Sequence, residues 1–202
     1  MGQKVGILGG TFNPIHNGHI TLAQTAYEQI GLDKVILMPS GKSYMKQDLF
    51  VLPGEERLKL IDMSIKGIPY LESSDIEITR KGNTYTFETL EFLKTNNPEN
   101  EYYFILGADC LFSMENWVKP ERIFSACTII AAVRNGKNKT DLENQAGRLN
   151  ELFNANIMLL DFNEMSISSS EIRKRLENNM SVDGLVPHNA LSYLKEKRFY
   201  CE

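Results

Sequence analysis

Cysteine, histidine and tryptophan are scarce in this chain of 202 residues, which contains three, three and one of them. The cysteines, Cys110, Cys127 and Cys201, are odd in number and show no CxxC spacing, which argues against a disulfide framework and a cysteine zinc site. The pattern favours reduced thiols in a cytoplasmic protein. Apolar runs such as residues 129–133 end far short of the roughly 18 residues of a membrane span, and the N-terminus has too short a run for a secretion signal.

Positive charge is not in excess either. The 22 Lys and Arg residues against 26 Asp and Glu residues give a formal net charge of -4, which argues against broad binding to nucleic acid or anionic membranes. Any phosphate chemistry must therefore come from local basic groups and helix ends. With 42% hydrophobic and 24% charged residues, the composition is that of a globular protein, and the length favours one large domain over residues 1–202.

Strand-like and helix-like segments alternate along the chain. Short apolar runs rich in β-formers predict strands over residues 4–8, 34–39, 70–78, 101–108, 127–133 and 156–161. Amphipathic spacing predicts helices within residues 19–32, 54–66, 84–95, 140–151, 169–177 and 189–197, with Gly31 as the C-terminal stop of the first. The paired acids of 54–57 indicate a solvated helix face. This alternation predicts an α/β fold of Rossmann-like type: a doubly wound, mostly parallel sheet with helices on both faces and a small helical C-terminal part over about 165–202.

Residues 6–20, GILGGTFNPIHNGHI, join a glycine-rich turn to two of the three histidines. Gly9, Gly10 and Thr11 follow the first predicted strand, and ligands of doubly wound sheets bind beyond such carboxyl ends. Glycines let backbone N–H groups approach a phosphate, and the following helix points its positive end at it. The stretch has neither GxGxxG nor GxxxxGK[ST], so it predicts neither a dinucleotide fingerprint nor a Walker loop.

His16 and His19 are spaced i, i+3 at the start of the first predicted helix, so both face one side of it. They could be packed or surface histidines without a chemical role. They could also bind zinc, although no third and fourth ligands stand nearby in the sequence. In the remaining interpretation, the imidazoles donate hydrogen bonds to phosphate oxygens that gain charge during a reaction.

Residues 167–176, ISSSEIRKRL, open a predicted helix with a different set of polar groups. Ser168 and Glu171 have the spacing of a capping box, which predicts Ser168 as the N-cap. In isolation, a capped and solvated helix is the favoured interpretation. Groups that could meet an anion there are two hydroxyls of the first turn and two arginines: Ser169, Ser170, Arg173 and Arg175.

Four stretches together resemble one enzyme family. Residues 10–19, GTFNPIHNGH, resemble the GTFDPxHxGH signature of the nucleotidyltransferase superfamily with T/HxGH motifs, with Asn13 in place of the usual aspartate. Residues 80–90, 107–117 and 167–176 are similar to the RxGxSYTxDTL, GaDxxxxlxxW and ISSTxIR motifs of the bacterial nicotinate-nucleotide adenylyltransferases. The resemblance extends over nearly the whole chain.

The resemblance implies transfer of AMP from ATP to nicotinate mononucleotide, which gives deamido-NAD and pyrophosphate. Mg²⁺ would accompany ATP without a metal site on the protein, neither nucleic acid nor membrane would be a partner, and a homo-oligomer stays open. His16, His19 and Arg173 would be the catalytic set. The ATP site would comprise Gly9, Gly10, Thr11, Phe12, His16, His19, Gly107, Ser168, Ser169, Ser170 and Arg173.

The mononucleotide site implied by the resemblance lies in the middle of the chain. Trp117 would stack on the pyridine ring, Asp109 would hold a ribose hydroxyl, and the backbone of residues 84–86 would receive the nicotinate carboxylate. Without the resemblance, Trp117 would more often belong to the core and residues 84–86 would be a plain helix start. The full set is Lys46, Thr84, Tyr85, Thr86, Asp109, Trp117 and Arg134.

Lys46 belongs to the loop of residues 39–53, whose length is typical of a functional flap. Ser43-Tyr44-Met45 stands there in place of the family's Pro-Pro-His, which puts the phosphate contacts of the loop in doubt. Arg134 is as consistent with a solvated side chain as with a phosphate ligand.

Two other functions stay open. Another member of the superfamily, such as a pantetheine-phosphate adenylyltransferase or a glycerol-phosphate cytidylyltransferase, would share the first motif, but such proteins are usually shorter and lack the other three. A non-catalytic nucleotide-binding protein would be consistent with Asn13 and the altered loop. The intact His16, His19 and Arg173 argue against that second possibility.

Overall fold

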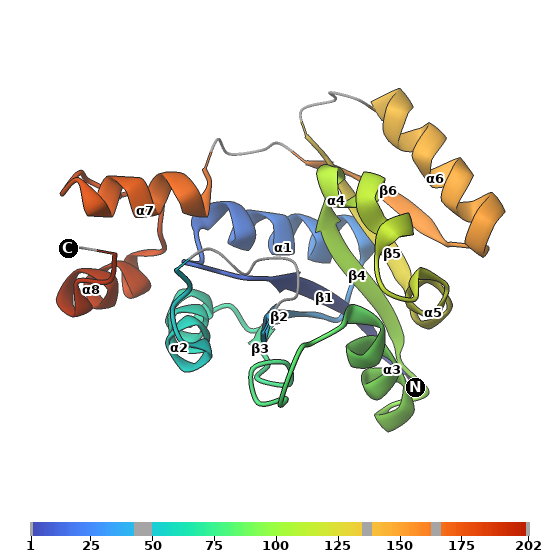
Figure 1. Cartoon of the computed structure of the whole chain (residues 1–202), viewed down its shortest axis with the longest axis horizontal. Coiled ribbons are helices and arrows are strands. Elements are labelled where there is room, and N and C mark those ends of the chain that lie inside the picture. The colour runs from blue at the N-terminus through green and yellow to red at the C-terminus, as the bar shows by residue number, and fades with distance from the viewer. Residues whose placement is uncertain (1, 43–49, 135–138, 163–166, 201–202) are drawn as a thin grey trace.

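The computed structural model describes residues 2–42, 50–134, 139–162 and 167–200. Strands formed by these residues make one sheet in the order β3-β2-β1-β4-β5-β6, in which each neighbouring pair is parallel (Figure 1). The strands are β1 (Lys4–Gly10), β2 (Lys34–Pro39), β3 (Leu71–Ser73), β4 (Glu101–Gly107), β5 (Thr128–Arg134) and β6 (Ile157–Phe162).

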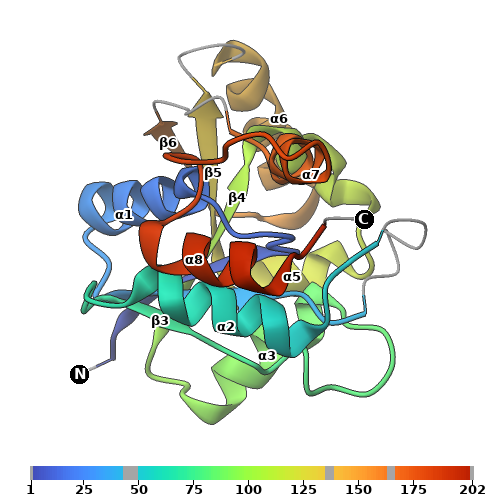
Figure 2. The same cartoon turned by 90° about the vertical axis from the view of Figure 1, so that its left-hand side faces the viewer.

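Helices cover both faces of this sheet. On one face, α1 (Asn17–Ile30) and α2 (Gly54–Ile65) share a core with the C-terminal helices α7 (Ser169–Glu177) and α8 (His188–Lys197). Figure 2 shows α8 alongside α2, so the C-terminal helices complete this layer of the fold. The other face carries α3 (Thr86–Asn96), α4 (Ala108–Ser113), the 3₁₀ turn η1 (Met114–Asn116), α5 (Pro120–Ala126) and α6 (Lys139–Phe153).

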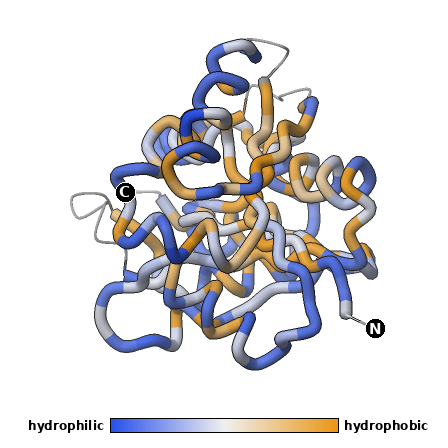
Figure 3. Tube along the Cα trace, turned by 90° about the vertical axis from the view of Figure 1, so that its right-hand side faces the viewer, coloured by the Kyte–Doolittle hydropathy of each residue, from blue (hydrophilic) through white to orange (hydrophobic). Residues whose placement is uncertain are grey.

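The central strands are buried on both sides. In β4, Tyr103 and Ile105 belong to the core under α1 and α2, whereas Tyr102, Phe104 and Leu106 belong to the core under α3 to α6. Figure 3 shows the resulting hydrophobic interior between more hydrophilic outer segments. Burial on both faces explains why these strands have nearly continuous apolar sequences, and it confirms the predicted doubly wound α/β fold.

The chain changes faces of the sheet after β3. Helices α1 and α2 connect β1, β2 and β3 on one face, and α3 then leads to β4 on the opposite face. Strands β1 and β4 are therefore neighbours from which the two halves of the sheet run in opposite directions. In open α/β sheets, ligands bind at this switch point, beyond the carboxyl ends of the strands.

Two predictions of secondary structure were wrong. The strand predicted over residues 70–78 ends at Ser73, because the chain then turns: the Thr79 amide donates to the Asp75 carbonyl at 3.0 Å. The strand predicted over residues 101–108 ends at Gly107, because Ala108 already begins α4, and Asp109 lies in the first turn of that helix. Among the described residues, no helix has both the length and the apolar character needed to cross a membrane.

Candidate active site

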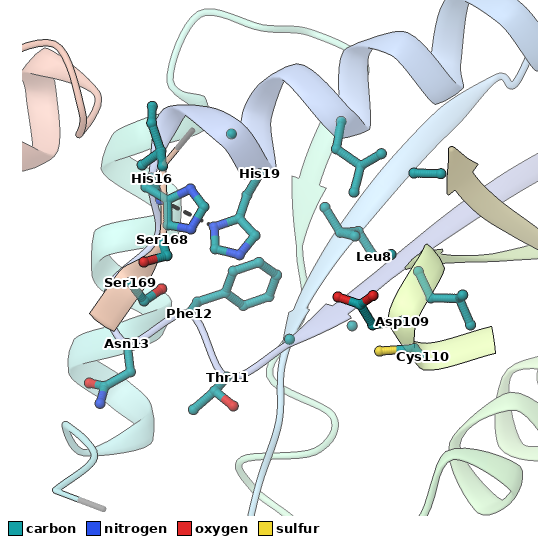
Figure 4. Close-up of a pocket in the computed structure, with 18 of the residues that line it drawn as sticks. Leu8, Thr11, Phe12, Asn13, His16, His19, Asp109, Cys110, Ser168 and Ser169 are labelled. Carbon is teal, nitrogen blue, oxygen red and sulfur yellow. Dashed lines mark hydrogen bonds between the residues drawn. The ribbon is translucent and has the colours of Figure 1, made fainter. Parts of the chain in front are cut away.

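A cavity of about 490 Å³ opens at the carboxyl ends of β1 and β4, at the predicted switch point. Figure 4 shows the two histidines with Ser168 and Ser169 at the start of α7 on one side of it, and Asp109 and Cys110 of α4 on the other. Segments that are more than a hundred residues apart in the sequence thus form one concave site. A concave site at this place in an α/β sheet is typical of ligand binding.

The residues predicted to bind ATP all line this cavity, as do Asp109 and Trp117 of the predicted mononucleotide set. The structure therefore brings together the first motif, the serines and arginine of α7, and the end of β4. Their roles remain predictions, because no ligand contact has tested them. The lining residues from the predicted ATP set are Gly9, Gly10, Thr11, Phe12, His16, His19, Gly107, Ser168, Ser169, Ser170 and Arg173.

The other predicted mononucleotide residues do not line it. Tyr85 and Thr86 form a small adjoining depression, to which Trp117 also contributes, and Thr84 is buried with its amide donating to the Lys42 carbonyl at 3.2 Å. Lys46 lies outside the described residues. Arg134 ends β5, and its side chain is likewise outside the described part of the structure.

The two histidines form a stacked pair at the start of α1. Their ring centroids are 3.7 Å apart with an angle of 26° between the planes. The backbone N–H of His16 donates to Nδ1 of His19 at 3.2 Å, which assigns the proton of a neutral His19 ring to Nε2 (Figure 4). His19 is partly exposed and lines the cavity, so it presents a fixed ring to a ligand.

Burial keeps both imidazoles uncharged near neutral pH. Desolvation lowers the pKa of His16 to about 4, and desolvation together with the neighbouring His16 lowers the pKa of His19 well below its usual value. Nδ1 of His16 is buried and has no hydrogen-bond partner among the described residues. A charged ring would bury an N–H there without an acceptor, which again favours the neutral form.

Glycines of the first motif make room for aromatic rings. A Cβ atom on Gly10 would lie 3.1 Å from the Phe12 ring, and one on Gly18 would lie 3.1 Å from Nδ1 of His16. Phe12 has a φ of 48°, in the left-handed region that side chains rarely adopt, and its ring packs edge-on against His19 with centroids 4.9 Å apart. Such strained backbone is typical of functional loops. Here it places the Phe12 ring against the His19 ring.

The serines and arginine of α7 dock on the backbone of the first motif. Ser168 is the N-cap and accepts from the Glu171 amide at 3.1 Å, which confirms the predicted cap. Ser169 Oγ donates to the Pro14 carbonyl at 2.8 Å, and Nη1 of Arg173 donates to the Asn13 carbonyl at 2.8 Å. The second motif is thereby held against the first.

Arg175 does not join this cluster. Its Nε donates to Glu171 at 2.9 Å and its Nη1 to the Ser181 carbonyl at 3.3 Å, and it does not line the cavity. Of the two arginines in residues 167–176, only Arg173 is placed to meet an anion in the cavity.

The opposite wall is built from α4 and η1. Nε1 of Trp117 donates to Ser113 Oγ at 3.2 Å, and the indole lies edge-on to Phe104 with centroids 6.3 Å apart. Trp117 is partly exposed at the cavity, so one part of the ring packs on the core while another remains available to a ligand. Asp109 is exposed and is the sole carboxylate among the described lining residues.

Arg57 holds the backbone of the first motif, although the sequence does not single it out. The paired acids of 54–57 predict a solvated helix face, but Arg57 is only 4% exposed. Its Nη1 donates to the Thr11 carbonyl and its Nε to the Leu52 carbonyl, both at 2.9 Å. Since its partners are backbone groups brought close by the fold, no local pattern in the sequence indicated the burial.

No metal centre is evident in the portion of the chain that the structure describes. There, His, Cys, Asp and Glu side chains form no group of three or more that could hold a metal ion.

Comparisons with known proteins agree with this geometry. The cytidylyltransferase-like family model matches residues 7–175. The "Probable nicotinate-nucleotide adenylyltransferase" of Dehalococcoides mccartyi (strain CBDB1) is 44% identical over 98% of this chain and 97% of that protein. A protein of the same name from Clostridium beijerinckii is 38% identical over 98% of this chain and 99% of its own length.

A solved structure has the same fold. That of Plasmodium falciparum nicotinic acid mononucleotide adenylyltransferase, complexed with NaAD, matches with a TM-score of 0.78 over 98% of this chain and 97% of that one. The sequence identity in this match is 19%, so the likeness concerns the fold.

Proposed function

This chain belongs to the nicotinate-nucleotide adenylyltransferase family of nucleotidyltransferases, and we propose that it transfers AMP from ATP to nicotinate mononucleotide, releasing deamido-NAD and pyrophosphate. The observation that carries this proposal is the meeting of two distant motifs at one cavity. His16 and His19 line it together with Ser169 and Arg173, which dock on the backbone of the first motif. Both motifs supply groups that bind phosphate oxygens.

The nucleophile of this reaction is the phosphate of the mononucleotide. Its second pKa is about 6, so the group is largely doubly ionised at neutral pH and needs no general base. An oxygen of this phosphate forms a bond to the α-phosphorus of ATP while the bond from that phosphorus to the bridging oxygen breaks. Pyrophosphate leaves with the electron pair, and the work of the protein is to align two anions and to offset their charge.

The histidines provide neutral hydrogen-bond donors for this step. The proton of His19 lies on Nε2 because Nδ1 accepts from the backbone of His16, so Nε2 is the atom that can donate to a phosphate oxygen. Stacking on His16 and edge contact with Phe12 hold the ring in place before the substrate arrives. Preorganised donors of this kind lower the barrier because they need no rearrangement as charge develops.

Arg173 supplies positive charge on the same side. Its Nη1 is held by the Asn13 carbonyl and its Nη2 donates to Ser170 Oγ at 3.3 Å. The guanidinium is partly exposed at the cavity, so it can attract the phosphates of ATP while its position stays fixed.

We infer that Mg²⁺ enters with ATP. Mg²⁺ commonly keeps several waters and binds to substrate phosphates, so the phosphates of ATP would hold the ion without a metal site on the protein. The ion would offset charge on the departing pyrophosphate.

We further propose that residues 1–202 act as one domain, since α7 and α8 share the core of α1 and α2. We also propose that the protein works in the cytoplasm.

An acceptor panel tests the proposed function. Pyrophosphate release is measured with ATP and, in turn, nicotinate mononucleotide, pantetheine phosphate or glycerol phosphate, and with CTP in place of ATP. We expect release with ATP and nicotinate mononucleotide, dependent on Mg²⁺. Release with another pair alone would assign the chain a different transfer reaction, and release with none would favour a binding protein.

A further inference from the structure

Asn13 is only 4% exposed, and its side chain has no part in the transfer chemistry described above. Its amide makes three hydrogen bonds to segments far away in the sequence. Nδ2 donates to the Phe50 carbonyl at 2.8 Å, and Oδ1 accepts from the Leu52 amide at 3.1 Å and from the Tyr200 hydroxyl at 2.6 Å. A buried polar group with so many partners indicates a role in positioning.

The two contacts with residues 50 and 52 form a bracket around Val51. The Phe50 carbonyl can only accept and the Leu52 amide can only donate, so the orientation of the Asn13 amide is fixed by its partners. Val51, between them, lines the cavity. The side chain of Asn13 thus holds one part of the cavity wall in place.

An aspartate could not form the same bracket. An ionised carboxylate offers acceptors alone, so one of its oxygens would face the Phe50 carbonyl oxygen without a proton between them. The path of residues 50–52 in this chain therefore suits an amide at position 13. This accounts for asparagine where the resembling signature has aspartate.

Neighbouring groups strengthen the bracket. Nε of Arg57 binds the Leu52 carbonyl, so both backbone polar groups of Leu52 are held. The ring of Tyr200, which follows α8, packs edge-on to Phe50 with centroids 6.1 Å apart. The C-terminal segment and the segment 50–52 therefore meet at one side chain.

The backbone of Asn13 holds an arginine that lines the cavity. The Asn13 carbonyl accepts from Nη1 of Arg173, the cation placed to attract phosphate. A shift of Asn13 would consequently move Arg173 and Val51 together. Val51 and Arg173 therefore both depend on the position of Asn13, the first through its side chain and the second through its backbone carbonyl.

We propose that Asn13 is a positioning residue for ATP binding, acting through Val51 and Arg173. The proposal rests on the proposed function only for the identity of the nucleotide.

The decisive variant is Asn13→Asp, which keeps the size of the side chain and removes one donor. We expect KM for ATP to rise about 5- to 30-fold, with a smaller change in kcat, because a buried contact is lost without loss of the donors to the transition state.

Asn150→Asp is the control for the substitution itself. Nδ2 of Asn150, an exposed residue of α6 that does not line the cavity, donates to the Ala155 carbonyl at 3.0 Å, so the same substitution removes an amide-to-carbonyl hydrogen bond outside the site. We expect its KM for ATP to equal that of the wild type. An equal rise in both variants would mean a general effect on stability and would overturn the proposal.

Two measurements keep the proposal testable apart from turnover. Hydrogen exchange of the Leu52 amide should be on the order of tenfold faster in Asn13→Asp, because repulsion between the carboxylate and the Phe50 carbonyl oxygen separates position 13 from residues 50–52. Calorimetric titration with ATP should show the same weakening as KM, and it can be made even if nicotinate mononucleotide is not the acceptor. Wild-type exchange and wild-type ATP affinity in Asn13→Asp would contradict the positioning role.

Tyr200→Phe covers the case in which Asn13→Asp does not fold. It removes one hydroxyl and leaves the bracket around Val51 intact. We expect a smaller rise in KM for ATP in the same direction. If this variant is folded, binds ATP as the wild type does and shows wild-type exchange of the Leu52 amide, the positioning role of Asn13 is refuted.

Discussion

The two walls of the cavity are held in different ways. On the wall formed by the first motif, the carbonyls of Thr11, Asn13 and Pro14 accept hydrogen bonds from Arg57, Arg173 and Ser169, which come from two other parts of the chain. On the opposite wall, Trp117 is anchored by Ser113, four residues away.

This difference predicts different consequences of mutation. The first wall is fixed by long-range contacts, which is what stabilisation of a transition state requires, because its donors must not move as charge develops. The long-range hydrogen bonds of the second wall, from Gln145 and Arg148 of α6, reach Leu111 and Glu115, which do not line the cavity. Its lining indole is held by Ser113 and contributes an aromatic surface. We therefore expect losses of kcat on the first wall and losses of mononucleotide affinity on the second.

The largest effect is expected for His19→Ala. Loss of one preorganised donor should lower kcat by about 10²–10³-fold, while binding of ATP is retained. Steady-state kinetics and calorimetric titration with ATP would measure the two quantities. Turnover within a few-fold of the wild type would show that the His19 ring does not act on the reacting phosphates.

Acid should destabilise the first wall. Burial lowers the pKa of His16 to about 4, so between this value and the ordinary histidine pKa of about 6.5 the unfolded chain binds more protons than the folded one. The free energy of unfolding should therefore fall as pH drops from 7 towards 5, by on the order of 2 kcal/mol for one such histidine. Denaturation of the wild type and of His16→Asn across this range would measure it, and equal slopes in the two proteins would contradict the assignment.

Arg57→Ala should weaken the support behind the first wall. It leaves the carbonyls of Thr11 and Leu52 without their donors, at a cost of about 1–3 kcal/mol in the free energy of unfolding. Chemical denaturation would measure this loss. Arg175→Ala is the control, because it breaks the partly exposed ion pair with Glu171 and should cost less than about 1 kcal/mol. An equal loss in both variants would mean that the buried hydrogen bonds of Arg57 add nothing to the free energy of unfolding.

Trp117→Ala should weaken binding of the mononucleotide at the second wall without affecting binding of ATP. Stacking on an aromatic side chain contributes about 1–3 kcal/mol per base, so KM for the mononucleotide should rise about tenfold. KM for ATP should change little. An equal rise for both substrates would place the indole elsewhere than on the second wall.

Much of the fold could be predicted from the sequence because its signals are local. The bounds of β2 and α7 agree with the predicted ranges, and Gly31 ends α1 in the left-handed conformation expected of a helix stop. In contrast, α4 and α5 have six and seven residues, which is too short to show a helical period. They were missed for that reason.

The site was predictable to the extent that its motifs are contiguous. The histidines of the first motif and the serines of α7 follow from short patterns, and the fold brings them together at the cavity. The roles of Asn13 and Arg57 could not be predicted in this way, since their partners lie at residues 50–52 and 200 and on the backbone of Thr11. Contacts between a side chain and a distant backbone leave no periodic trace in the sequence.

The most direct test of the proposed function compares two acceptors that differ in one group. Rates are measured with ATP and either nicotinate or nicotinamide mononucleotide, and the dinucleotide product is identified. We expect deamido-NAD to form, with a higher kcat/KM for the acid than for the amide, because backbone N–H groups of Tyr85 and Thr86, in the depression beside Trp117, would receive the carboxylate. Formation of product from the amide alone, or from neither mononucleotide, would contradict the proposed reaction.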